Sequence, residues 1–157
     1  MKSQDFQTFL FKSAVSVMAC DGNISEMEVA EIKKMVANEI YFMDYNYEQP
    51  LNDNLANIKA NGKSAINQYL NELTNADLNE RQELLLIEVL IRMIEADTQI
   101  EENEVKFLQM VKAKLKVSEE TLIVKFPNQI EYLVDANNFG ASTSFDSDIK
   151  LTDGQSN

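Results

Sequence analysis

The chain has 157 residues, of which 45% are hydrophobic, and its 14 basic and 26 acidic side chains give a net charge of −12. This length is typical of one domain with a core of its own, and the composition excludes a wholly disordered chain. The negative charge argues against a nucleic-acid partner, because it repels phosphate groups, and favours cations or a basic protein surface. No apolar run has the length of a membrane span, so we expect no insertion into a membrane.

Two further features of the composition limit the chemistry. The chain contains no histidine, which removes the usual general base and the usual transition-metal ligand. Cys20 is the only cysteine, so no internal disulfide can form and a cytoplasmic location is the simplest interpretation. With no glycine-rich phosphate loop either, the sequence predicts a protein that is not an enzyme.

The first half of the chain predicts four helices. Apolar residues spaced by three and four predict the first helix, from about Asp5 to Cys20, and a second helix runs from Glu26 to about Phe42. The stretch from Tyr41 to Pro50 is expected to be an aromatic turn, whose rings either pack on the core, which we favour, or form an exposed surface for a partner. A short, weak helix is expected in residues 52–62 and another in residues 63–73.

The second half predicts a central helix and three shorter ones. Asp77 to Glu80 is expected to be the capping box of a helix that is apolar on nearly all sides from Leu84 to Ile94, with Glu88 and Arg92 placed to pair four residues apart. Further helices are predicted at residues 102–115, after the cap Ser118, and within residues 128–134. Residues 136–157 are rich in Ser, Thr, Asp, Asn and Gly and predict a disordered tail, so the domain is expected to span residues 1–135.

An internal repeat relates the two halves. A shift of 76 positions places Asp21, Ile24, Glu26, Glu28 and Val29 on Asp97, Ile100, Glu102, Glu104 and Val105. Each copy reads as a helix, a short acidic loop and a second helix. The fold class predicted is therefore all-α: a single bundle of about seven helices that contains two related helical hairpins.

The repeated acids admit two interpretations. Carboxylates at the end of one helix and in the first turn of the next can converge, and such clusters suit calcium or magnesium. Alternatively, the acids only cap helices: Ser25 and Glu28 fit a capping box, although the second copy has Glu101 at the cap position and still keeps Glu104. An EF-hand is excluded, because Glu26 and Glu102 occupy the position of its turn glycine.

The segment from Asp21 to Glu28, preceded by Val17-Met18-Ala19, resembles the A-D-G-x-I-x-x-x-E signature of the tellurite-resistance TerB family, which is also found in the N-terminal region of the co-chaperone DjlA. The second copy, from Glu95 to Glu104, is similar but has Thr98 in place of the glycine. The resemblance covers roughly residues 5–134. It implies a helical, cytoplasmic, stress-related domain that binds a divalent cation through Asp21, Glu28, Asp97 and Glu104.

Two functional hypotheses follow from these patterns. The first is a cation-responsive TerB-like module, with calcium or magnesium as the expected cofactor. The second is a metal-independent interaction domain that recruits a protein partner, expected to be basic, through its acidic and aromatic surfaces. The sequence identifies neither the partner nor the oligomeric state.

Overall fold

The computed structural model describes residues 1–134, 140 and 144–151, and the described part contains helices and no strand. In chain order these are α1 (Ser3–Ala19), α2 (Glu26–Asn38), η1 (Ile40–Phe42), α3 (Glu48–Asn61), α4 (Lys63–Thr74), α5 (Glu80–Ile94), α6 (Glu102–Lys114), α7 (Glu119–Lys125) and α8 (Ile130–Leu133). The prediction of an all-α bundle with about seven helices is confirmed.

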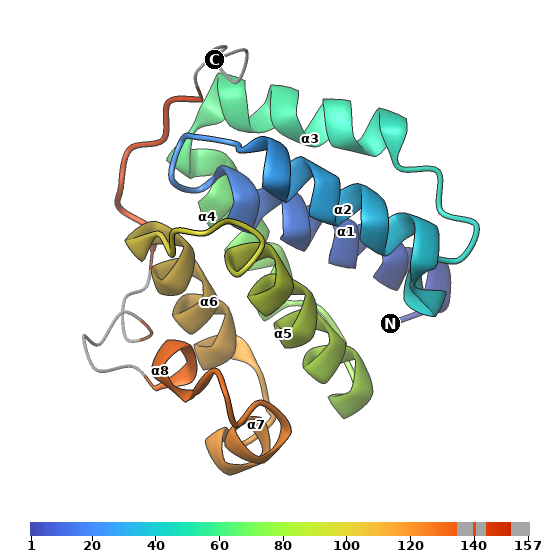
Figure 1. Cartoon of the computed structure of the whole chain (residues 1–157), viewed down its shortest axis with the longest axis vertical. Helices are drawn as coiled ribbons and strands as arrows, with labels where there is room; N and C mark the ends of the chain where they lie inside the picture. The colour runs from blue at the N-terminus through green and yellow to red at the C-terminus, as the bar shows by residue number, and fades with distance from the viewer. Residues whose placement is uncertain (135–139, 141–143, 152–157) are drawn as a thin grey trace.

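Helices α1 and α5 form the centre of the bundle. Figure 1 shows α2 in front of α1, with α3 at the top of the view and α5 and α6 below; α1 packs mainly on α5 and α3, and α2 also contacts α5. Leu10, Phe11 and Ala14 of α1 and Leu86 and Ile87 of α5 are fully buried. These residues recur at helical spacing, so burying them removes a continuous apolar stripe from water on each helix.

Capping side chains set where the helices begin. The capping box predicted for Ser25 and Glu28 is confirmed at the start of α2. The box predicted from Asp77 to Glu80 is wrong by two residues: Asn79 caps α5 and exchanges hydrogen bonds with Gln82. The side chain of an Asn, like that of an Asp, can accept a hydrogen bond from the backbone N–H of the third helical residue. Here the side chain of Gln82 in turn accepts a hydrogen bond from the backbone N–H of Asn79.

Two helix boundaries differ from the predicted ones. Helix α2 ends at Asn38, and the separate turn η1 follows it. Helix α3 begins at Glu48 and includes Pro50, which was predicted to close the preceding turn. Proline is tolerated in the first turn of a helix, where its missing N–H has no intrahelical acceptor to lose.

The aromatic turn faces the core, as favoured from the sequence. Phe42 is fully buried and lies edge-on to Phe11, with 6.1 Å between ring centroids. Tyr45 also stacks at a tilt on Phe11. The exposed apolar side chains of this turn are instead those of Ile40 and Met43, with 72% and 57% of their surface accessible.

Arg92 does not make the predicted pair with Glu88. Its guanidinium donates to Glu31 of α2 at 2.8 and 3.0 Å and to Glu39, the residue after α2, at 2.8 Å. It also donates to the hydroxyl of Tyr41 at 3.2 Å. Two carboxylates, one in α2 and one just after it, can together accept more of the N–H groups of the planar guanidinium than Glu88 alone could.

Part of the predicted tail packs on the domain. Residues 144–151 run along α6 and α4 to the end of α3 (Figure 1), and Phe145 and Ile149 are 1% and 7% exposed. This stretch therefore departs from the expected disorder, because its two apolar side chains find a surface that the sequence pattern did not reveal. The other residues of the predicted tail, apart from Gly140, lie outside the described part.

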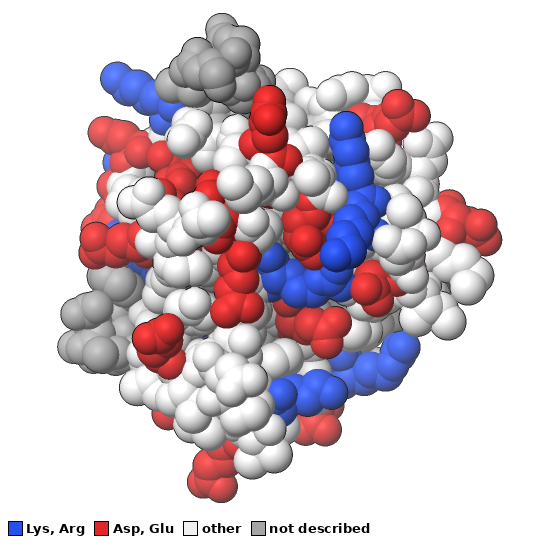
Figure 2. Space-filling view, in the orientation of Figure 1, with Lys and Arg blue, Asp and Glu red and all other residues white. Residues whose placement is uncertain are grey.

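The surface carries the charge that the composition implies. Figure 2 shows acidic side chains spread over one face, with fewer basic side chains gathered between them. No helix among the described residues is long and apolar enough to cross a membrane.

Candidate functional site

The two acidic loops of the repeat meet in space. The Sγ atom of Cys20, at the end of α1, lies 3.1 Å from the carbonyl oxygen of Val17 and 3.4 Å from that of Asn103 in the first turn of α6. The Asn103 side-chain amide donates to the carbonyl oxygen of Cys20, also at 3.4 Å. The N-terminus of α6 is thereby held against the loop between α1 and α2.

Glu28 and Glu104, which are equivalent positions of the repeat, form a buried pair at this junction. Only 3% of Glu28 and 1% of Glu104 is exposed. Glu28 accepts the backbone N–H of Ser25 at 2.9 Å, as its capping box requires. Burial, a hydrogen bond with Glu28 and repulsion from Glu28 and Asp21 hold the pKa of Glu104 far above its usual range.

Asp21 completes the acidic cluster, by which we mean Asp21, Glu28 and Glu104. One of its oxygens accepts the backbone N–H of Asn23 at 2.9 Å. Burial, together with repulsion from Glu28 and Glu101, raises the pKa of Asp21 to about 6 even though the bond from Asn23 opposes the shift. Gly22 follows with a φ of 82°, a conformation that favours glycine and turns the chain after the carboxylate.

Asp97, the fourth predicted site residue, is not joined to the other three by the described interactions. Its carboxylate accepts the backbone N–H of the next residue, Thr98, at 2.7 Å. Thr98 is not among the described residues with positive φ, so this loop does not reproduce the turn at Gly22. The two loops therefore have different backbone conformations, because Thr98 stands where the first loop has a glycine and a β-branched residue strongly disfavours positive φ.

Glu101 is a functional neighbour that the sequence analysis did not place in the site. It contributes to the raised pKa of Asp21, and its backbone N–H partly opposes the rise in the pKa of Glu104. Glu101 makes no capping bond with its own side chain, so the second copy lacks the capping box of the first.

The acidic cluster can hold a positive charge, and one atom is left without a partner. Glu104 Oε2 is buried and accepts no hydrogen bond within the described structure. A buried carboxylate oxygen without a donor is costly, and a proton or a cation removes that cost. Carboxylate oxygens are the ligands that calcium and magnesium prefer, so the donor set fits these ions. As the side chains stand, however, no three Asp, Glu or Cys residues in the described part are arranged to hold a metal.

Nucleophilic chemistry has little support at this site. Cys20 is fully buried, and burial followed by repulsion from Glu104, Asp21 and Glu28 raises the pKa of its thiol well above the usual value. A thiol in such surroundings stays protonated and unreactive. The chemistry open to the cluster is the binding of a proton or a hard cation.

The fold and this junction define a class of protein: an acidic, all-helical domain in which two related hairpins bring carboxylates together at their loops. The family model described as "Tellurite resistance protein TerB" matches residues 10–124. The chain therefore belongs to the TerB family, and the resemblance noted in the sequence is confirmed. This family is not a known enzyme family. No curated protein and no solved structure matches the chain.

Proposed function

We propose that this tellurite-resistance-associated helical module binds a divalent cation, calcium or magnesium, at the acidic cluster and releases a proton as it does so. The observation that carries the proposal is the buried Glu104, whose Oε2 lacks a partner although Glu28 and Asp21 lie beside it. Asp21, Glu28 and Glu104 are the side chains that hold the ion in this proposal, and Asp97 contributes indirectly at most. We further propose a cytoplasmic location, no catalytic role and no nucleic-acid partner.

The proton and the cation compete for the same carboxyl oxygens. At neutral pH the raised pKa of Glu104 keeps a proton in the pair, which neutralises part of the repulsion in the absence of metal. A divalent ion offsets all of that repulsion but needs the carboxylates ionised, so binding must expel the proton. A small movement of the side chains is also required, because their present arrangement does not form a complete shell of ligands.

The test is calorimetric titration of the purified chain with calcium and with magnesium, in two buffers of different ionisation enthalpy. We expect the measured heat to differ between the buffers, which reports the released proton, and the affinity to rise with pH. Thermal melting in parallel should show stabilisation, about 2.7 kcal/mol when the free ion is at a hundred times its dissociation constant.

Matched variants locate the site. Asp21→Asn and Glu104→Gln should abolish the response, whereas Asp97→Asn and Glu102→Gln, which remove acids outside the cluster, should preserve it. If the wild type shows no heat and no change in melting at millimolar ion, the cation proposal is refuted. If Asp97→Asn reduces cation binding as much as Asp21→Asn does, the acidic cluster is not the binding site.

The alternative is a metal-independent domain that recruits a basic protein partner. One observation favours it: Ile40 and Met43 are large apolar side chains that stand exposed close together in the chain. Under this alternative the acids of the cluster act only in capping and packing, and pull-down with Ile40→Ser and Met43→Ser variants should lose the partner while cation titrations remain flat.

A further inference from the structure

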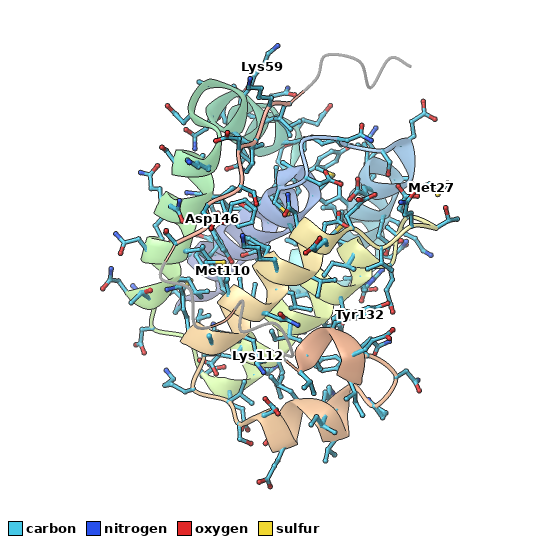
Figure 3. The ribbon with its side chains drawn as sticks, turned by 90° about the vertical axis from the view of Figure 1, so that its left-hand side faces the viewer. Met27, Lys59, Met110, Lys112, Tyr132 and Asp146 are labelled. Atoms are coloured by element: carbon cyan, nitrogen blue, oxygen red, sulfur yellow. The ribbon has the colours of Figure 1, made fainter. Side chains whose placement is uncertain are left out.

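Residues 144–151 lie on the domain as a bound peptide does. Phe145 and Ile149 are buried, Ser147 and Leu151 are partly buried, and the residues between them are exposed. Alternation with a period of two is typical of an extended chain with one face against a surface. Figure 3 shows this segment, with Asp146 on it, crossing the face of the molecule over α4 and α6 toward α3.

Asn67 of α4 recognises the backbone of the segment. Its side-chain amide donates to the carbonyl oxygen of Phe145 at 2.8 Å, and its carbonyl oxygen accepts the N–H of the same residue at 2.6 Å. One side chain thus satisfies both polar backbone groups of Phe145. Paired bonds to the main chain with a pocket for the side chain are the usual means of recognising an extended peptide.

Helix α6 recognises the side chains of the segment. The ammonium group of Lys106 lies 5.2 Å from the centroid of the Phe145 ring and forms an ion pair with Asp146. Ser147 donates to the side chain of Asn103 at 3.3 Å. These contacts suit an aromatic residue followed by an acid, through a cation–π contact and a charge pair.

Two glycines let the segment approach the domain closely. A β-carbon on Gly22 would lie 3.1 Å from the carbonyl oxygen of Lys150, and one on Gly62 would lie 3.0 Å from that of Ile149. Lys63, next to Gly62, also pairs with Asp148 at 3.5 Å. Helices α4 and α6 and these two turns thus contact the segment along its length.

The segment is also separable from the family domain. The match to the TerB family covers residues 10–124, so this stretch lies outside the part that the family shares. Its ion pairs are on the surface, where each contributes little, and only two large side chains anchor it. Such a segment opens locally at a lower free energy than the helices beneath it unfold.

We propose that the groove formed by Asn67, Asn103, Lys106, Gly22 and Gly62 is a peptide-binding site. Its ligand is an extended acidic peptide with the pattern Phe-Asp-x-Asp-Ile, and the chain fills the site in cis with its own residues 144–151. A tethered segment has a high effective concentration, so it excludes the same peptide offered in trans until the tethered copy is weakened.

The experiment measures binding of a fluorescent peptide of residues 144–151 to the full chain by anisotropy. We expect Phe145→Ala, which weakens the tethered copy, to bind the peptide about tenfold or more tightly than the wild type does. Adding Asn67→Ala to that variant should remove the gain, whereas adding Gln68→Ala, a change at an exposed neighbour, should not. A peptide with alanine in place of its phenylalanine should fail to bind.

Contrary results overturn the proposal. If Phe145→Ala remains folded and does not gain binding, or gains it irrespective of Asn67, no peptide site exists. If Phe145→Ala unfolds, hydrogen exchange of the wild type decides: the amide of Phe145 should exchange about tenfold or more faster than the core amides of α1 and α5. Equal rates would show that residues 144–151 dissociate from the domain only when the whole chain unfolds.

Discussion

At the scale of the residue, the pair formed by Glu28 and Glu104 is the most unusual feature of this chain. The two positions are equivalent in the repeat, so the pseudo-symmetry places like groups against each other at the junction. Both are nearly inaccessible, and burial together with the neighbouring carboxylates holds the pKa of Glu104 far above its usual range. Two carboxylates in contact cannot both ionise cheaply in a poorly solvated site, so one keeps its proton.

This pair predicts an unusual dependence of stability on pH. The native pKa of Glu104 is raised, so above about pH 4.5 the folded chain retains a proton that the unfolded chain loses, and stability falls as pH rises toward the native pKa. The slope should approach about 1.4 kcal/mol per pH unit for one proton. Urea unfolding between pH 7 and pH 8 measures it, because Asp21, with its pKa raised to about 6, is mostly ionised there.

Glu104→Gln is the decisive variant for this dependence. Glutamine imitates the protonated acid, so the variant should lose most of the slope and exceed the wild type by about 1 kcal/mol or more at pH 8. The control is Glu102→Gln, an exposed acid in the same turn of α6, which should keep the wild-type slope. A wild type whose stability does not change over this range contradicts the raised pKa.

At the scale of the element, contacts between helices replaced several local pairings that the sequence predicted. Glu88 stands four residues before Arg92, yet the guanidinium reaches across to Glu31 in the middle of α2 and to Glu39 just after its end. The arginine therefore fixes how α2 lies on α5. Since α2 carries Glu28, this contact also helps to position the acidic cluster.

Replacing Arg92 with lysine tests this role. Lysine keeps the charge but cannot donate to two carboxylates and a tyrosine hydroxyl from one plane, so we expect a loss of about 1–2 kcal/mol in unfolding free energy. Arg81→Lys on the same helix, at an exposed position, should change stability by less than about 0.5 kcal/mol. Equal effects of the two changes would show that the network around Arg92 contributes nothing beyond its charge.

At the scale of the whole molecule, the junction of the two repeats buries the one cysteine of the chain. Cys20 lies at its centre, fully buried and bonded to Asn103 of the other repeat. Exposure of the thiol therefore requires α6 to separate from the loop between α1 and α2. The reactivity of one cysteine thus reports whether the two halves of the domain are together.

We expect the thiol of Cys20 to react with a disulfide reagent only when the junction opens. In native buffer its rate should be about a thousandfold or more below the rate in denaturing urea, because burial and the raised pKa both protect it. The control is Ser64→Cys in a Cys20→Ser background, which places a thiol on an exposed position of α4 and should react at once. Rapid reaction of native Cys20 would mean that the junction is open much of the time.

The sequence alone determined the helical class, the repeat and most caps. Apolar residues at helical spacing predicted α1 and α5, because this spacing is a local feature of the sequence. Ser25 and Ser118 likewise mark helix starts, because each caps its helix through a bond to the residue three positions later. The family was also readable from the acidic signature. The same local reasoning misplaced the start of α3, since the tolerance of a helix for proline depends on which turn holds it.

Only the tertiary structure decided which of the four predicted acids meet. Asp21, Glu28 and Glu104 converge because α6 docks on the loop after α1, whereas Asp97 turns to its own backbone at a loop that lacks glycine. Packing also chose the partners of Arg92 and placed Phe145 beside Asn67 and Lys106. These are contacts between residues far apart in the chain, and their energy depends on distances that periodicity and composition do not contain.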